Sequence, residues 1–267
     1  MLAVARLFRG TEGAPRERAW IALLFACVAA QLYASYYLGW FLGLALALAM
    51  VWGFAFGDTR AQLLDLLRRR WAALVIAVGF TGIALWPLAS HSLEAARTVG
   101  LRPYESVDLP SLPSWIYLGA RNVMYGWMPA VEPFRSLPGL HHEQRLGVGL
   151  LTTVIAAAGI WGHRSQPGVR LVALTGLSIV LLATRLPFGL EPWHAVHSLV
   201  PGAAAIRAVA RFGLMLLILW AIGFSLWLGA RRTAWAAAVA VLVMLGEQLQ
   251  AAERFDRLEM REAATRS

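Results

Sequence analysis

The sequence predicts an all-α protein, a polytopic transmembrane helical bundle of about seven helices with one long loop outside the membrane. Of its 267 residues, 59% are hydrophobic and 15% are charged, whereas a soluble domain carries about 25% charged residues. Uncharged runs of about 18 residues or more are long enough to cross a bilayer as helices. Such runs occupy residues 19–57, 71–93, 146–163 and 212–230. The surface is therefore suited to lipid rather than to water.

The first uncharged run, 19–57, is long enough for two helices. As one helix it would measure about 58 Å, against a hydrocarbon core of about 30 Å. We therefore expect helices near 20–35 and 38–57. The connecting stretch 34–40, ASYYLGW, forms either a tight hairpin or a re-entrant bend, and a re-entrant bend requires that other helices cover its backbone.

Five further helices are expected along the chain. They lie near residues 71–89, 146–163, 169–186, 208–229 and 233–250. Two of them rest on short uncharged runs, 171–184 and 233–246. These two are plausible crossings if Arg185 and Glu247 lie at the membrane interface, where polar helix ends are tolerated.

Arginine placement predicts the orientation of the bundle. The arginines that flank the expected helices on one side are Arg6, Arg9, Arg16, Arg18, Arg60, Arg68, Arg69, Arg70, Arg164, Arg170, Arg231 and Arg232. Seven crossings put all of them on the same side, which the positive-inside rule assigns to the cytoplasm. We therefore expect a cytoplasmic N-terminus.

The same crossings divide the chain into four parts. These are N-terminal membrane helices at 1–89, an extracytoplasmic loop at 90–145, C-terminal membrane helices at 146–250 and a surface tail at 251–267. The loop is too long to be a simple connector. It is rich in proline, serine and aromatic residues, and we expect short interfacial helices within it, lying along the outer membrane surface.

Several classes of function are disfavoured. The net charge of +9 does not indicate a nucleic-acid partner, because the arginines alternate with apolar runs and do not form one solvated patch. Cys27 is the only cysteine, so neither an internal disulfide nor a cysteine-rich metal site is expected. Since no glycine-rich phosphate loop, nucleophile elbow or zinc signature occurs, no cofactor is expected either.

Four stretches resemble the C-terminal half of large bacterial membrane glycosyltransferases of the GT-C type. They are QLYASYYLGWFL (31–42), LWPLASHSLEAARTVGLRPYESVDLPSLPSWI (85–116), HHEQRLGVGLL (141–151) and VPGAAAIRAVARFGLML (200–216). The resemblance implies a multi-pass protein of the bacterial cytoplasmic (inner) membrane. It also implies an active site that faces away from the cytoplasm and a polyprenyl-phosphate sugar as the donor.

The chain departs from that family at one important point. Enzymes of the GT-C type carry their catalytic acid in the first outer loop, often in an Asp-Asp or Asp-Glu pair, and no such pair occurs here. We therefore expect an incomplete or degenerate chain, with a missing N-terminal half encoded upstream as a partner. The alternatives are a transporter or flippase component and a non-catalytic membrane scaffold. The near absence of charge inside the expected helices disfavours a transporter.

Arg207 and Arg211 are the strongest candidates for a binding site. They lie four residues apart at the start of the expected helix 208–229, and therefore on one helical face. The planar guanidinium forms paired hydrogen bonds with phosphate oxygens, and a helix N-terminus also favours an anion. The resemblance implies that this phosphate belongs to the lipid-linked donor. Arg185, which ends the preceding expected helix on the same outer side, is a candidate third contact. Alternatively, the arginines are interfacial and extend to lipid headgroups.

Weaker candidates lie in the expected loops. The candidates for a catalytic acid or base are Glu105 and Glu143, and those for substrate contact are Arg102, Trp193 and His194. Trp193 would stack on a pyranose ring. For each of them, an ion pair, a loop cap or an interfacial contact is the alternative. His141 and His142 are adjacent, and adjacent residues seldom converge on one metal ion, so no metal site is expected.

Overall fold

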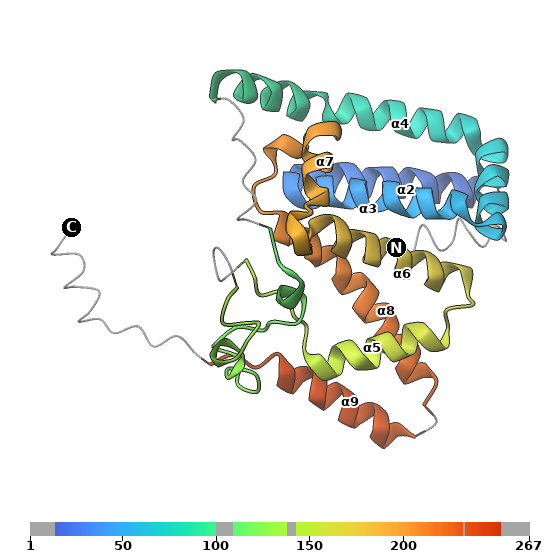
Figure 1. Ribbon diagram of the computed structural model, residues 1–267. Coiled ribbons are helices and arrows are strands. Elements are labelled where there is room, and N and C mark those ends of the chain that lie inside the picture. Colours follow the sequence, from blue (N-terminus) through green and yellow to red (C-terminus); the bar gives the residue numbers. More distant parts are fainter. Residues whose placement is uncertain (1–13, 100–108, 138–142, 232, 252–267) are drawn as a thin grey trace.

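The computed structural model describes residues 14–99, 109–137, 143–231 and 233–251 (Figure 1). Every regular element within these ranges is a helix, which confirms the all-α class. The helices long and apolar enough to cross a membrane are Pro15–Ala34, Tyr36–Ala55, Gly57–Glu94 and Val209–Gly229. Three more apolar helices are shorter: Leu150–Gly162, Pro167–Ala183 and Ala234–Glu247. The four long helices indicate a membrane protein, and the expected count of seven crossings stays a prediction.

Helices α2 (Ala14–Ala34) and α3 (Tyr36–Ala55) form a tight hairpin. Only Ser35 separates them; its backbone is extended, and its hydroxyl accepts the backbone N–H of Leu38 at 3.4 Å. Gly39 lies against α2 so closely that a Cβ there would overlap Leu32. The 34–40 stretch is therefore a hairpin turn and not a re-entrant bend.

Helix α4 (Gly57–Val99) breaks at Arg70, whose φ of −127° and ψ of 17° are not helical. The part before the break stands across the ends of α2 and α3, and the part after it runs back alongside α2 (Figure 1). The first part was not expected from the sequence. It forms because Thr59, Leu63 and Leu66 share one face, which is covered, while Arg60, Asp65 and Arg68 are exposed. The helix also continues through residues 90–99, so the expected start of the loop at residue 90 is wrong.

In the described part of the second half of the chain there are five α-helices. They are α5 (Leu150–Gly162), α6 (Pro167–Ala183), α7 (Pro192–Leu199), α8 (Leu216–Gly229) and α9 (Ala234–Glu247). Helices α5 and α8 cross at very close range: a Cβ on Gly159 would overlap the carbonyl oxygen of Gly223, and a Cβ on Gly223 would overlap that of Ala156. Small residues permit such close backbone contact between membrane helices.

The helices give the molecule two distinct ends (Figure 1). One end carries Arg69, Arg70 and Arg170, and we call it the arginine-rich end. Ion pairs join the helices there. Glu17 of α2 is buried and lies 2.6 Å from Arg70 and 3.3 Å from Arg69 of α4. Arg170 of α6 lies 2.7 Å from Asp58 of α4. The opposite, loop end gathers the turn at Ser35, the stretch 109–137 and residues 184–215.

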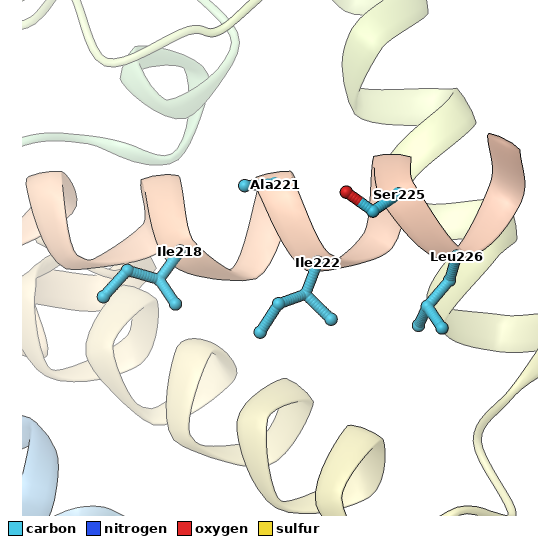
Figure 2. Close-up of a pocket in the computed structure, with 5 residues that line it drawn as sticks. All are labelled: Ile218, Ala221, Ile222, Ser225 and Leu226. Atoms are coloured by element: carbon cyan, nitrogen blue, oxygen red, sulfur yellow. The ribbon is translucent and has the colours of Figure 1, made fainter. Parts of the chain in front are cut away.

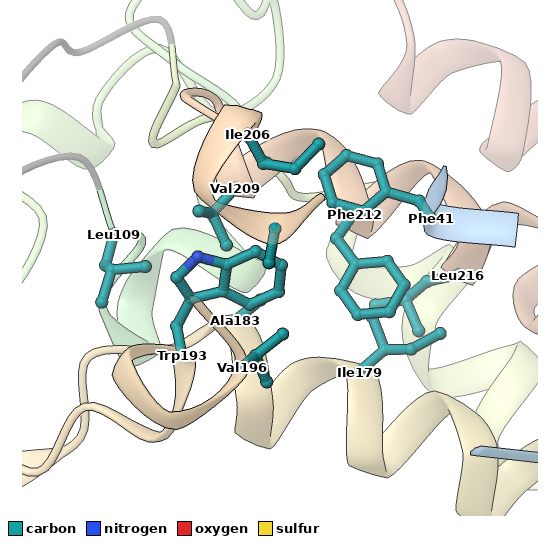
Figure 3. Packing of buried hydrophobic residues seen from close by; sticks show 11 residues of the cluster. Phe41, Leu109, Ile179, Ala183, Trp193, Val196, Ile206, Val209, Phe212 and Leu216 are labelled. Carbon is teal, nitrogen blue, oxygen red and sulfur yellow. The ribbon is translucent and has the colours of Figure 1, made fainter. Parts of the chain in front are cut away.

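An aromatic core fills the loop end (Figure 3). The rings of Phe41 and Phe212 stack with their centroids 4.9 Å apart, and Trp193 meets both of them edge-on at 6.3 and 6.2 Å. This core joins α3, α7 and the segment that leads into α8, and so fixes residues 203–215 in place. Within 109–137, the helical elements are the short 3-10 turns Leu112–Trp115 and Met128–Ala130. Their expected position along the membrane surface stays a prediction.

Candidate functional site: an arginine pair at the loop end

Two aromatic side chains of α3, Tyr36 and Trp40, form hydrogen bonds with the segment that carries the candidate arginines. The Tyr36 hydroxyl donates a hydrogen bond to the carbonyl oxygen of Gly202 at 3.1 Å. The indole Nε1 of Trp40 donates to the carbonyl oxygen of Pro201 at 3.0 Å. Gly202 has a φ of 82°, and a Cβ at this position would also meet the Tyr36 hydroxyl. A glycine is therefore needed where the chain turns toward Arg207.

Arg207 and Arg211, which we call the arginine pair, both contact Tyr37. The Tyr37 hydroxyl accepts the backbone N–H of Arg207 at 3.0 Å. The guanidinium of Arg211 lies over the Tyr37 ring, 5.4 Å from its centroid, in cation–π geometry. Both arginines are exposed. Among the residues that the structure describes, neither guanidinium has a carboxylate within ion-pair distance.

The helical geometry expected for the arginine pair is wrong. Arg207 precedes the helix, and Arg211 lies in a 3-10 helix, Val209–Met215, that becomes α-helical only at Leu216. A 3-10 helix has three residues per turn, so positions four apart do not share a face. The segment takes this form because Ile206, Val209 and Phe212 are drawn into the aromatic core. The arginines are related through Tyr37 instead.

Arg185 does not extend the arginine pair as a free third cation. Its Nε lies 3.5 Å from the Glu191 carboxylate, so its charge already faces an acidic partner. Its backbone N–H donates to the carbonyl oxygen of Pro110 at 2.8 Å. Arg185 therefore joins the end of α6 to the start of the 109–137 stretch.

The weaker candidates do not converge on the arginine pair. Trp193 is 0% exposed in the aromatic core, so its ring faces are covered and the expected stacking on a sugar is wrong. His194 is exposed on α7, and Glu143 is half-buried in a turn. Arg102, Glu105, His141 and His142 lie outside the described residues.

Among the described residues, the acidic group with the most hydrogen-bond donors is Glu247 at the end of α9, which the sequence does not single out as a site residue. It is fully buried against the N-terminus of α5. One carboxylate oxygen accepts the Tyr125 hydroxyl at 2.5 Å and the backbone N–H of Leu151 at 2.8 Å. The other accepts the backbone N–H and the hydroxyl of Thr152 at 2.8 and 2.7 Å. The carboxylate thus satisfies N–H groups that a helix N-terminus leaves unpaired.

The surroundings of Glu247 indicate a structural role. A carboxylate has about four acceptor sites, and four donors already occupy those of Glu247. Desolvation, and then the hydrogen bond to Glu247, raise the pKa of Tyr125 to about 12, so the phenol stays protonated and donates even in alkaline solution. Gly149 has a φ of 105°, and a Cβ there would overlap the Glu247 carboxylate. The only sequence signal was an acid directly after an apolar run.

Glu247 also anchors the 109–137 stretch to α9 and α5. The Asn122 side chain donates to the backbone carbonyl of Glu247 at 2.7 Å. Two backbone hydrogen bonds continue this contact, from Val123 to Leu249 at 3.0 Å and from Ala251 to Arg121 at 2.8 Å. The stretch around Asn122 is therefore fixed to α9 and, through Glu247, to α5.

The fold and the site together define a helical membrane protein with an exposed arginine pair at the end opposite its arginine-rich end. Within the described ranges, no three histidine, cysteine, aspartate or glutamate side chains are grouped closely enough to hold a metal ion. Comparison of the chain with known protein families, with curated proteins and with solved structures finds no match.

Proposed function

We propose that this membrane protein binds the phosphate group of a polyprenyl-phosphate-linked sugar at Arg207 and Arg211, as the C-terminal part of a GT-C glycosyltransferase would. The observation that carries the proposal is the arginine pair itself: two exposed guanidiniums, without carboxylate partners in the described structure, that share Tyr37. The resemblance of residues 200–216 to such enzymes adds support.

The arrangement suits a phosphate at a membrane interface. Arginine forms paired, charge-assisted hydrogen bonds with phosphate oxygens. Tyr37 fixes the backbone of Arg207 and one face of Arg211, so less side-chain freedom is lost on binding. The proposed role is donor binding. The acid that catalysis requires would come from a partner chain, because the outer-loop acidic pair is missing from this sequence.

Replacing either member of the arginine pair by alanine should weaken binding of a short-chain polyprenyl-phosphate sugar by about tenfold. The reason is the loss of a charge-assisted hydrogen bond worth about 1.5 kcal/mol. Arg207→Lys and Arg211→Lys should recover only part of the affinity, because an ammonium lacks the planar fork. The measurement is a binding titration of the detergent-purified protein.

Two controls make this titration specific. Arg164→Ala removes an exposed arginine at the opposite end and should leave the affinity unchanged. A polyprenol without phosphate should bind equally to wild type and variants. If Arg207→Ala and Arg211→Ala bind the phosphate-linked sugar as wild type does, the arginines are interfacial anchors, and the scaffold alternative is favoured.

The proposed orientation places the arginine-rich end in the cytoplasm and the loop end outside. Ala120 and Gln62 are exposed on the loop and on the first part of α4, respectively. In a Cys27→Ser background, Ala120→Cys should react with an impermeant maleimide in intact cells, and Gln62→Cys should react only after permeabilisation. The reverse labelling pattern would show that the orientation is the opposite of the proposed one. Equal labelling of both positions in intact cells would show that they lie on the same side of the membrane, and would therefore exclude an odd number of membrane crossings between residues 62 and 120.

A further inference from the structure

An apolar groove runs between α2 and α4 at the arginine-rich end of the molecule. Six of its eleven lining residues are alanines, contributed by both helices, and Phe25 and Phe80 are among the others. Arg18 is the only charged residue that lines it. Because small side chains face each other across the groove, the helices leave a gap that neither fills.

Two polar contacts close the ends of this gap. At one end, Glu17 of α2 pairs with Arg70 of α4 at 2.6 Å. At the other, the Tyr33 hydroxyl of α2 donates to the carbonyl oxygen of Ala84 in α4 at 2.5 Å. Helices α2 and α4 are therefore held together on both sides of the groove, which opens sideways between the two contacts.

The length of the groove corresponds to one leaflet of a bilayer. The lining residues of α2 run from Arg18 to Ala29 and those of α4 from Ala73 to Ala84. At 1.5 Å per residue, each run rises about 16 Å, which is close to half of a hydrocarbon core of about 30 Å. The acyl chain of a lipid in one leaflet matches the length of this groove. A transmembrane helix of another protein would need a groove that extends across the whole membrane.

Arg18 supplies charge at the membrane-surface end of the groove. It is exposed, and in the described part of the chain it has no carboxylate partner, since the adjacent Glu17 is held by Arg69 and Arg70. An arginine near the surface attracts anionic lipid headgroups. A second groove, along α8, offers a contrast, because its residues, which include Ile218, Ala221 and Ser225, carry no charge (Figure 2).

We infer that the α2–α4 groove is a binding site for an anionic phospholipid, with one acyl chain between the helices and the headgroup phosphate at Arg18. This site is separate from the arginine pair, which lies at the other end of the molecule, and it does not depend on the proposed function. The bound lipid lies in the groove between the two polar contacts that join α2 to α4.

The test is native mass spectrometry of the full chain, purified in detergent and supplied with phosphatidylglycerol or phosphatidylcholine. Wild type should retain phosphatidylglycerol about fivefold more strongly, because one interfacial arginine contributes about 1 kcal/mol. Arg18→Gln should remove this preference, because it weakens retention of phosphatidylglycerol more than retention of the zwitterionic phosphatidylcholine. Ala26→Leu fills the groove and should reduce retention of both lipids by at least fivefold.

A matched variant controls for general effects of added bulk. Ala221→Leu fills the uncharged groove of α8 and should keep the preference for phosphatidylglycerol. Thermal unfolding midpoints of all variants should stay within a few degrees of wild type when no lipid is added. Equal retention of the two lipids by wild type, or wild-type retention by Ala26→Leu, would overturn the inference. So would a lipid-free dimer that Ala26→Leu converts to monomer, since a second copy of the chain would then be the occupant.

Discussion

Replacing Glu247 by alanine is expected to destabilise the protein by about 4 kcal/mol, the typical cost of removing one partner from a buried charged network. The substitution leaves the N–H groups of Leu151 and Thr152 without their acceptor, and the Tyr125 hydroxyl without its partner. Each buried donor left unsatisfied costs about 1–3 kcal/mol. The measurement is thermal or denaturant unfolding in detergent.

Two further variants separate the network from the loss of a glutamate in general. Glu247→Gln keeps one acceptor oxygen but turns an amide toward N–H donors, so it should recover no more than half of the loss. Glu132→Ala removes an exposed glutamate that, in the described part of the chain, accepts a hydrogen bond from the Ser136 hydroxyl at 2.7 Å, and it should shift stability by less than about 0.5 kcal/mol. Similar unfolding midpoints for Glu247→Ala and Glu132→Ala would contradict the structural role of the network.

Adding a single methyl group at Gly159 is expected to separate α5 from α8. In Gly159→Ala the new Cβ meets the backbone carbonyl of Gly223, and a backbone atom cannot rotate away as a side chain would. Overpacking of this kind costs about 1–3 kcal/mol. Gly223→Ala should behave in the same way, because its Cβ meets the carbonyl oxygen of Ala156.

The matched control is Gly162→Ala, which makes the same chemical change on the same helix. Nothing lies within 4 Å of a Cβ at Gly162. Because alanine favours a helix over glycine, this variant should be as stable as wild type or slightly more stable. A comparable loss of stability in Gly162→Ala and Gly159→Ala would show that the close crossing of α5 and α8 does not limit stability.

The apolar helices could be predicted from the sequence because each depends on a local property. The structure has a helix within each region where an uncharged run predicts one. Charged residues such as Asp58 and Arg164 lie close to the ends of some of these helices. The first part of α4 was missed because it is amphipathic rather than uniformly apolar. Its inward face is visible only when α3 is placed beside it, where Leu63 packs over Gly53.

The candidate site was predicted only in part, because its contacts join distant residues. The types and spacing of Arg207 and Arg211 were sufficient to select them. Their conformation depends on Tyr37, which lies 170 residues away from Arg207 in sequence. Similarly, Thr152 is 95 residues from Glu247, and Trp193 is buried by rings from other segments. No local pattern records such pairings.

Tyr37 makes the arginine pair and the α2–α3 hairpin energetically dependent on each other. One side chain accepts the Arg207 N–H and lies under the Arg211 guanidinium, so a displacement of α3 moves the environment of both arginines together. Coupling free energies are reciprocal. An anion that binds the arginines more tightly when α3 is in place must therefore stabilise the position of α3 by the same amount.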